Sequence, residues 1–228
     1  MIILNVQFAT NGNYHPADLR GSLLVSNHIS WLDVIALNAA TPATFVAKSE
    51  VRNWPLLGWL CVRVGTLFIK RETARDTVRV NRMISSMLLR GECIALFPEG
   101  TSSDSGLPGH FHSSLLQSCV DTKSSLYPVG IRYHDKTGKS NNDAAFVGDM
   151  SFIQSLWAIL SSPSLHVTLY YLPALAGAES SRRSLAAEAQ GLIHMTLVNF
   201  SPNHSVCVQS AMPISPNEAC PQFSRISA

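Results

Sequence analysis

A histidine and an aspartate follow an apolar run in the segment Asn27-His28-Ile29-Ser30-Trp31-Leu32-Asp33. A neutral imidazole can take the proton from a hydroxyl group that acts as a nucleophile. A carboxylate on the other ring nitrogen would fix the tautomer, as in a Ser-His-Asp triad that lacks the serine. The hydroxyl would then belong to a substrate. In the alternative interpretation Asp33 caps a helix and His28 is an ordinary loop residue, and Asp33 can also serve both purposes.

A second segment, Phe97-Pro98-Glu99-Gly100-Thr101, follows another apolar run and contains the breaker residues typical of a turn. A carboxylate and a glycine at the end of a strand suit a turn that faces a substrate, since glycine lets backbone N–H groups approach a ligand closely. The alternative for so short a segment is an ordinary turn with an exposed glutamate.

A third segment, Gly65-Thr66-Leu67-Phe68-Ile69-Lys70-Arg71, reads as a strand that ends in two cations. Lysine and arginine at such a position can bind an anionic head group. The alternative interpretation is a strand end whose charges are solvated.

These three segments and Tyr127-Pro128-Val129 occur in this order in one chain. Together they resemble the glycerolipid acyltransferase family, which includes the lysophosphatidic acid acyltransferases. The family blocks N-H-x-S-x-x-D, G-x-x-F-I-x-R and F-P-E-G-T are all matched. A fourth block, a V-P-V-like strand, is matched with Tyr127 in the first place. The resemblance covers roughly residues 20–175.

The resemblance implies an enzyme that moves a fatty acyl group from acyl-CoA or acyl-carrier protein to the hydroxyl of a lysolipid of the 1-acylglycerol-3-phosphate type. It implies that no metal or other cofactor is needed. In this family His28 would be the general base and Asp33 its orienting partner. The implied substrate-binding residues are Arg71, which would bind the phosphate or another anionic group, and the acceptor-positioning turn of Glu99, Gly100 and Thr101.

Two departures from the family pattern concern positive charge. Many members continue F-P-E-G-T with Arg-Ser, whereas this chain has Ser102-Ser103. Where an F-K-x-G-like string often follows, this chain has Phe111-His112-Ser113-Ser114. Both changes remove a cation from the expected head-group site. In this respect the chain is similar to bacterial acyltransferases that act on other lysolipids, including lyso-ornithine lipid, so the acceptor stays open.

Two further functions remain as alternatives. One is a catalytically silent lipid-binding protein on the same fold, although the intact residues His28, Asp33 and Glu99 argue against it. The other is a hydrolase of acyl thioesters, in which water replaces the lysolipid. Free fatty acid formed without any lysolipid would identify the hydrolase.

Composition limits the remaining possibilities. The chain has 228 residues, enough for one sizeable domain, and a charged fraction of 14% against about 25% in typical soluble proteins. Such a chain buries much of its length or touches a membrane. The net charge of +2 gives no indication of nucleic-acid binding. Five scattered cysteines without a C-x-x-C pair predict neither disulfides nor zinc, and His110 and His112 read as a loop pair.

Membrane contact is expected to be peripheral, at the cytoplasmic face, because no run of 18 apolar residues and no secretory signal occur. The resemblance implies an apolar N-terminal anchor in many members, and this chain begins close to the first block, so we expect either a naturally short form or a fragment. Contact would then fall to an apolar stripe near Arg52 and Arg63, although core packing is the better interpretation for at least half of that stripe. The stripe comprises Trp54, Leu56, Leu57, Trp59 and Leu60.

The elements that must position these residues alternate along the chain. Apolar runs predict strands at residues 23–25, 44–47, 64–69, 93–97, 126–131 and 165–172. Periodic segments predict helices at residues 30–40, 50–63, 74–90, 110–120, 150–160 and 185–197. This alternation indicates an α/β fold, and the resemblance implies a mixed, largely parallel sheet flanked by helices. We expect a lead-in at residues 1–20, an acyltransferase domain at 21–200 and a disordered tail at 201–228.

Overall fold

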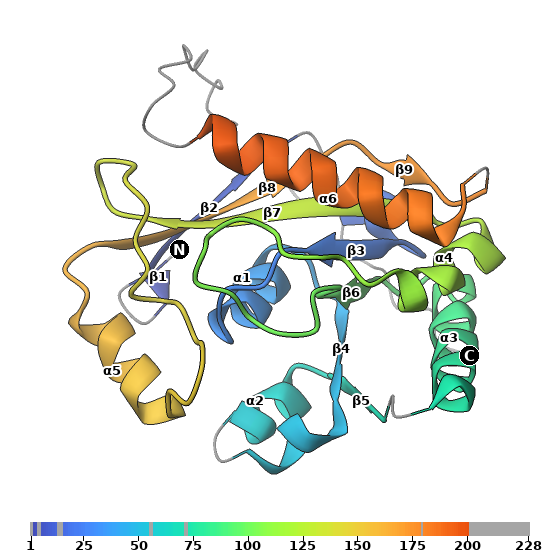
Figure 1. Ribbon diagram of the computed structural model, residues 1–228, viewed down its shortest axis with the longest axis horizontal. Coiled ribbons are helices and arrows are strands. Elements are labelled where there is room, and N and C mark those ends of the chain that lie inside the picture. Colours follow the sequence, from blue (N-terminus) through green and yellow to red (C-terminus); the bar gives the residue numbers. More distant parts are fainter. Residues whose placement is uncertain are drawn as a thin grey trace, which may run out of the picture.

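A computed structural model describes residues 2–3, 6–12, 16–54, 57–70, 73–178 and 180–200 of the chain (Figure 1). In this part of the chain nine strands form one sheet, in the order β1-β2-β8-β7-β3-β6-β4-β5, with β9 paired to β7. The strands are β1 (Ile2–Ile3), β2 (Val6–Asn11), β3 (Leu23–Ser26), β4 (Thr44–Lys48), β5 (Leu67–Ile69), β6 (Ile94–Leu96), β7 (Ser125–His134), β8 (Leu165–Tyr171) and β9 (Leu175–Ala176).

The sheet is mixed and largely parallel, as predicted. Strands β7, β3, β6, β4 and β5 run parallel to one another, and β8 is antiparallel to β7. The helices are α1 (Leu32–Ala40), α2 (Leu57–Arg63), α3 (Ala74–Leu89), α4 (Gln117–Thr122), α5 (Phe152–Ser161) and α6 (Arg182–Asn199). Short 3₁₀ segments are η1 (Pro16–Leu19), η2 (Ser49–Asn53) and η3 (Ser113–Leu116).

Helices cover both faces of the sheet. Successive side chains of a strand point to opposite faces, so the apolar strands present side chains that must be buried on both. On β3, Leu24 belongs to the core cluster that packs against α1 and α5. Its neighbours Leu23 and Val25 belong to a second cluster, which packs against α3, α4 and α6. Figure 1 shows α6 on one side of the sheet and α1, α2 and α5 on the other. The uninterrupted apolar strands of the sequence are the consequence of this double burial.

Helix α3 has the boundaries that its sequence predicts. At its start, Thr73 and Asp76 form a capping box, each side chain accepting the other residue's backbone N–H. At its end, Gly91 has a φ of 83°, and its N–H donates to the carbonyl of Leu88 at 2.9 Å. Glycine adopts this left-handed conformation without a Cβ clash, so the helix stops there.

The predicted helix at residues 50–63 is wrong in one respect, because it is divided into η2 and α2. Trp54 ends η2 in an extended conformation, with φ −74° and ψ 130°. A residue that precedes a proline is driven out of the helical region by the proline ring, and Pro55 comes next in the sequence. The strand expected at residues 64–69 is likewise shorter, because Gly65 forms a turn with a φ of 74°.

The lead-in expected at residues 1–20 contains two strands, β1 and β2, that the sequence did not predict. Strand β2 pairs in parallel with β8 from Val6 to Asn11. Only Val6 is buried along it, so its pattern lacks the apolar run that marks the central strands. The tail predicted at residues 201–228 lies outside the described residues.

Candidate active site

The candidate site lies where β3, β6 and β4 end side by side. These three strands are parallel neighbours, so their carboxyl ends meet at one edge of the sheet. His28 follows the end of β3, Glu99 follows the end of β6, and Lys48 is the last residue of β4. Crevices outside the carboxyl ends of strands are where open α/β sheets bind ligands.

His28 and Asp33 are hydrogen-bonded, with 2.9 Å between Nδ1 of the ring and Oδ2 of the carboxylate. Because an ionised carboxylate only accepts, Nδ1 carries the proton and the lone pair of Nε2 remains free. The imidazole is partly exposed, stacks on the ring of Phe97 at 4.1 Å and lines an open pocket. The pair therefore has the geometry of a general base with its orienting carboxylate.

Asp33 is fully buried and accepts hydrogen bonds from several donors. The backbone N–H groups of Ile29 and Ser30 donate to Oδ2 at 2.7 and 2.9 Å. The hydroxyl of Tyr133 donates to Oδ1 at 2.7 Å. These bonds hold the loop that precedes α1. The helix begins at Leu32 rather than at Ser30, and its N-cap residue Trp31 makes no side-chain capping bond, so the suggested capping by Asp33 is not found. Burial, and then the Asp33 carboxylate, raise the pKa of Tyr133 well above its ordinary value.

Asn27 connects the end of β3 to β7 through its side chain. Its amide nitrogen donates to the carbonyl of Ile131 at 2.9 Å, and its amide oxygen accepts from the N–H of the same residue at 2.7 Å. The side chain thereby replaces one step of the backbone ladder after β3 ends. This arrangement fixes the backbone position from which His28 projects.

Glu99 lies in the turn after β6 and is almost completely buried. Its Oε1 atom accepts the backbone N–H of His28 at 3.0 Å. Burial raises the pKa of Glu99, and hydrogen bonds from the backbone of His28 and Gly109 oppose that rise. Glu99 therefore supports the loop that carries the imidazole and also lines the larger of two pockets.

The smaller pocket, of about 280 Å³, is the one that His28 borders. Its walls are mainly apolar and come from α1, β4, α2 and the loops after β6 and β7. They include Trp31, Val34, Phe45, Val51, Trp54, Leu57, Phe97 and Phe146. A pocket of this kind suits a hydrocarbon chain beside the imidazole.

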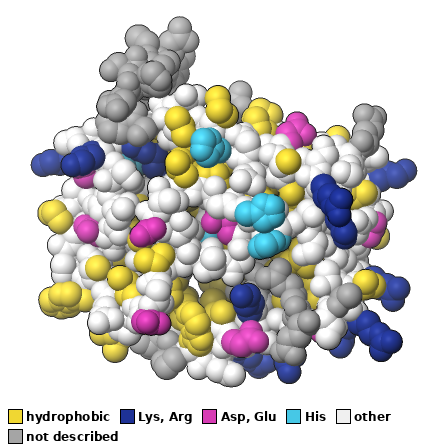
Figure 2. Space-filling view, viewed as in Figure 1, with side chains coloured by type: hydrophobic (Ala, Val, Ile, Leu, Met, Phe, Trp, Pro, Cys, Tyr) yellow, Lys and Arg dark blue, Asp and Glu magenta, His cyan; other side chains and the backbone are white. Residues whose placement is uncertain are grey.

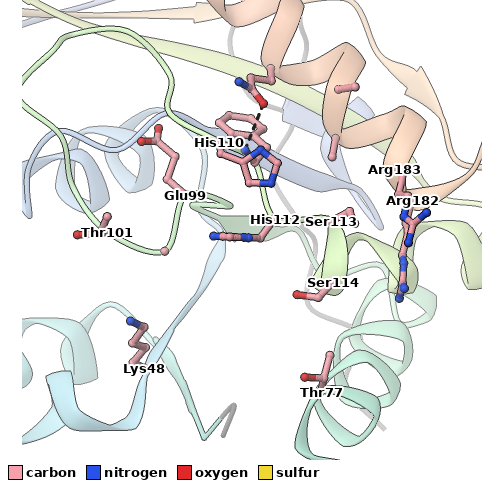
Figure 3. Close-up of a pocket in the computed structure, with 15 residues that line it drawn as sticks. Lys48, Thr77, Glu99, Thr101, His110, His112, Ser113, Ser114, Arg182 and Arg183 are labelled. Atoms are coloured by element: carbon pink, nitrogen blue, oxygen red, sulfur yellow. Dashed lines mark hydrogen bonds between the residues drawn. The ribbon is translucent and has the colours of Figure 1, made fainter. Parts of the chain in front are cut away.

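The larger pocket, of about 950 Å³, is lined mostly by polar and charged residues and does not border His28. Lys48, Gly100 and Thr101 line both pockets, so the two adjoin. Figure 3 shows Glu99 and Lys48 on one side of the larger pocket and Arg182 and Arg183, at the start of α6, on the other. The combination suits a polar or anionic group close to the apolar pocket.

The structure brings together all the predicted site residues that it describes. Thr101 is exposed in the turn that Gly100 makes with a φ of 74°. Arg71 lies outside the described residues. The sequence analysis did not identify Tyr133, Lys48 or the arginine pair of α6 as site residues. Of these, only the two adjacent arginines at the start of an amphipathic helix form a pattern that could have indicated an anion-binding site.

His110 and His112 contact each other, with ring centres 5.0 Å apart, and both line the larger pocket. Within the described ranges no group of three histidine, cysteine, aspartate or glutamate side chains is arranged to hold a metal ion. The pair therefore contributes polar donors to the pocket wall.

Comparisons with known proteins agree with this geometry. The family model described as Acyltransferase matches residues 8–132. The 1-acyl-sn-glycerol-3-phosphate acyltransferase of Neisseria gonorrhoeae is 36% identical over 173 residues, which span 75% of this chain and 67% of that protein. The lyso-ornithine lipid O-acyltransferase of Pseudomonas aeruginosa is 35% identical over 175 residues, spanning 77% and 67%.

A solved structure supports the fold. The crystal structure of the 1-acyl-sn-glycerophosphate acyltransferase PlsC from Thermotoga maritima superposes with a TM-score of 0.57, covering 86% of this chain and 73% of that one. The two sequences are 19% identical, so the likeness concerns the fold alone. From the family model and the relatives it follows that the chain belongs to the acyltransferase family, as its four sequence blocks indicated.

Proposed function

We propose that the protein transfers a fatty acyl group from an acyl thioester to the hydroxyl of a lysolipid, with His28 as general base. The observation that carries the proposal is the 2.9 Å bond from Nδ1 of His28 to the buried Asp33, which leaves Nε2 free at the pocket. The names of the relatives, one acting on 1-acyl-sn-glycerol-3-phosphate and one on lyso-ornithine lipid, support this class of acceptor.

In the proposed reaction Nε2 of His28 takes the proton of the acceptor hydroxyl while the oxygen attacks the thioester carbonyl carbon. The tetrahedral intermediate then collapses, the C–S bond breaks, and the imidazolium returns the proton to the leaving thiolate. Asp33 stabilises the imidazolium between these steps. An ester and a free thiol result, so no metal, oxidant or other cofactor is required.

The donor and the acceptor would occupy different pockets of the two that adjoin. The apolar pocket beside His28 suits a fatty acyl chain, and the polar pocket suits the acceptor head group. The donor is acyl-CoA or acyl-carrier protein, both of which present the same thioester. Gly100 and Thr101 lie at the boundary of the pockets, where the reacting hydroxyl would pass.

The head group of the acceptor would be anionic. This chain lacks the arginine that the family pattern often has after F-P-E-G-T, since Ser102 stands there and its hydroxyl binds the carbonyl of Phe146. Lys48, Arg182 and Arg183 supply positive charge to the polar pocket from other elements. A phosphate and the carboxylate of an ornithine lipid are both compatible with such a site, and the acceptor panel below separates them.

We also propose that the protein works at the cytoplasmic face of a membrane. In the part of the chain that the structure describes, no helix has the length and apolarity needed to cross a bilayer. Of the predicted apolar stripe, Trp54 and Trp59 are exposed, Leu57 is buried and Leu60 is half-buried. Leu56 lies outside the described residues. The exposed tryptophans support peripheral contact.

The test is acyl transfer from a labelled acyl-CoA and an acyl-carrier protein to a panel containing lysophosphatidic acid and lyso-ornithine lipid. Wild type is compared with His28→Ala, whose rate should fall by about 10²–10⁴-fold on the preferred acceptor. Equal rates would remove His28 from the mechanism. A wild type that binds lipid but transfers nothing would favour a silent lipid-binding protein, and free fatty acid without lysolipid would favour a hydrolase.

A further inference from the structure

The tryptophans of this chain divide sharply by exposure. Trp31 is buried, whereas Trp54, Trp59 and Trp157 are 45%, 60% and 71% exposed. Large aromatic side chains are usually withdrawn from water, and tryptophan is enriched where an apolar phase meets water. Trp54 and Trp59 belong to the η2–α2 region that the sequence identified, but Trp157 lies on α5, about 100 positions further along the chain.

Helix α5 has an exposed apolar face without any charge. Its sequence is Phe-Ile-Gln-Ser-Leu-Trp-Ala-Ile-Leu-Ser, and a capping box formed by Ser151 and Gln154 fixes its start. Ile153 and Trp157 are four positions apart and 70% and 71% exposed, and Leu160 follows one turn later at 45%. These spacings place the three side chains along one side of the helix. Ser155 and Ile159 are buried, so the helix is anchored by its other side.

Helix α2 lines the apolar pocket with Leu57 and Cys61, and α5 is joined to the pocket wall through its buried residue Ser155. On one side, the indole of Trp31 donates to Ser155 of α5 at 3.0 Å, and Trp31 lines the pocket. On the other side, Trp54 lies with its ring 6.2 Å from that of Phe146, and both line the pocket. Figure 1 shows α5 and α2 on the same side of the sheet, and Figure 2 shows apolar side chains gathered over them.

The charged side chains beside the two helices balance one another, and the pairing of a cation with an exposed indole suits the interface between lipid and water. The guanidinium of Arg63 lies 5.1 Å from the ring centre of Trp59, so a cation accompanies an exposed indole there. Arg52, 6.0 Å from the ring of Phe68, adds a second cation. Exposed Glu50 and Asp149 precede the two helices in the chain, so the apolar side chains must supply most of the binding. Membrane-surface helices combine these features.

We infer that α5 is a membrane-docking helix, which with η2 and α2 forms one surface that seats the mouth of the apolar pocket on the bilayer. The surface consists of Trp54, Trp59, Val62, Ile153, Trp157 and Leu160. A lysolipid could then present its head group and hydroxyl to the pockets near His28 while its own chain stays in the bilayer. The inference rests on the proposed function, because that function supplies a substrate that resides in the membrane.

The test measures binding of the full chain to vesicles of phosphatidylcholine and phosphatidylglycerol by co-sedimentation. The test variant is Ile153→Ser/Trp157→Ser, which changes only exposed side chains of α5. The matched control is Leu89→Ser/Met195→Ser, whose side chains are 74% and 62% exposed on α3 and α6, the other face of the sheet. Circular dichroism and the thermal midpoint establish that all three proteins are equally folded.

The expected result is a partition coefficient about tenfold or more lower for the α5 variant, with the control equal to wild type. Brominated lipid should quench Trp157 fluorescence in a Trp54→Phe/Trp59→Phe background. Equal binding of all three proteins would overturn the inference. A concentration-dependent dimer of wild type that the α5 variant no longer forms would also overturn it, because a second copy of the chain would then cover the surface. A second assay, acyl transfer to a short-chain lysolipid that stays monomeric in water, separates the two proposals. If wild type binds vesicles but transfers no acyl group in this assay, the result contradicts the proposed function alone.

Discussion

The backbone N–H of His28 donates to Oε1 of Glu99 at 3.0 Å, although the two residues are 71 positions apart in the chain. The bond joins the first and third sequence blocks at the ends of the adjacent strands β3 and β6. The imidazole is thus held from two directions, by Asp33 at its ring and by Glu99 at its backbone. Glu99 can therefore affect catalysis without touching a substrate.

The raised pKa of Glu99 gives a first prediction about stability and pH. Burial makes the folded protein bind a proton at Glu99 more readily than the unfolded chain, whose carboxyl has a pKa near 4.5. The stability that protonation contributes is complete below the unfolded pKa and is lost as the pH rises through the folded pKa. In urea titrations from pH 7 down to pH 5, the free energy of unfolding of wild type should therefore increase relative to Glu99→Gln.

Asp104→Asn serves as the control for this series, because Asp104 is exposed. The free energy of unfolding of this variant should differ from that of wild type by a constant amount between pH 7 and pH 5. The free energies of unfolding of wild type and Glu99→Gln could instead differ by a constant amount, or the glutamine variant could gain stability at lower pH. Either result would show that the folded pKa of Glu99 is not raised.

A second prediction concerns Tyr133, whose hydroxyl donates to Asp33 at 2.7 Å inside the core. Tyr133→Phe should lower the free energy of unfolding by about 1.5–3 kcal/mol, the usual contribution of a hydrogen bond to a charged group. It should also lower kcat with little change in KM, since Asp33 loses a donor that holds it against His28. Urea denaturation and steady-state kinetics measure the two effects.

Tyr127→Phe is the matched control, because Tyr127 lies on the same strand and its hydroxyl makes only a long, exposed bond of 3.5 Å. Its stability should stay within about 0.5 kcal/mol of wild type. If both variants lose the same amount, the cost belongs to the substitution itself and not to the contact with Asp33.

The fold and the hydrogen-bonded pair of His28 and Asp33 could be predicted from the sequence because both depend on local patterns. Apolar runs and helical periodicity identified β3, β6 and α3, and the family block identified His28 with Asp33. The hydrogen bonds that hold the pair in place could not be predicted. Tyr133 on β7 and Asn27 after β3 form them, and the register of these neighbouring strands is known only from the folded sheet. Strand β2 was missed because a strand with one buried side chain carries little signal.

A third prediction uses the close approach of Gly109 to Glu99. A Cβ atom at residue 109 would lie 2.9 Å from Oε2 of Glu99, so the carboxylate would have to move. Gly109→Ala should therefore lower kcat/KM by roughly tenfold, as expected when one hydrogen bond to a charged group is disturbed. Gly191→Ala on α6 is the control, because nothing lies within 4 Å of the position that its new methyl group would take.

The control should be active and more stable by about 1 kcal/mol, since alanine is the better helix former. Kinetics and thermal denaturation of the two variants are compared in parallel. Full activity of Gly109→Ala would mean that the position of Glu99 does not matter for turnover.

The last prediction concerns the arginines at the start of α6, which line the polar pocket and have no carboxylate partner among the residues that the structure describes. If they bind the anionic head group, Arg182→Gln/Arg183→Gln should raise KM for the preferred acceptor by about 10–100-fold, the loss of one or two charge-assisted hydrogen bonds. The turnover number should change little, because neither residue touches the reacting hydroxyl. The effect should shrink at high salt, which screens exposed charges.

Arg79→Gln/Arg82→Gln removes the same charge from the exposed side of α3, away from both pockets, and should leave KM unchanged. The two doubles are assayed with lysophosphatidic acid and with lyso-ornithine lipid. A KM that rises for one acceptor only identifies the head group that the α6 arginines bind. Equal KM values in both doubles would assign the anion to Lys48 or to a residue outside the described ranges, and would remove α6 from acceptor recognition.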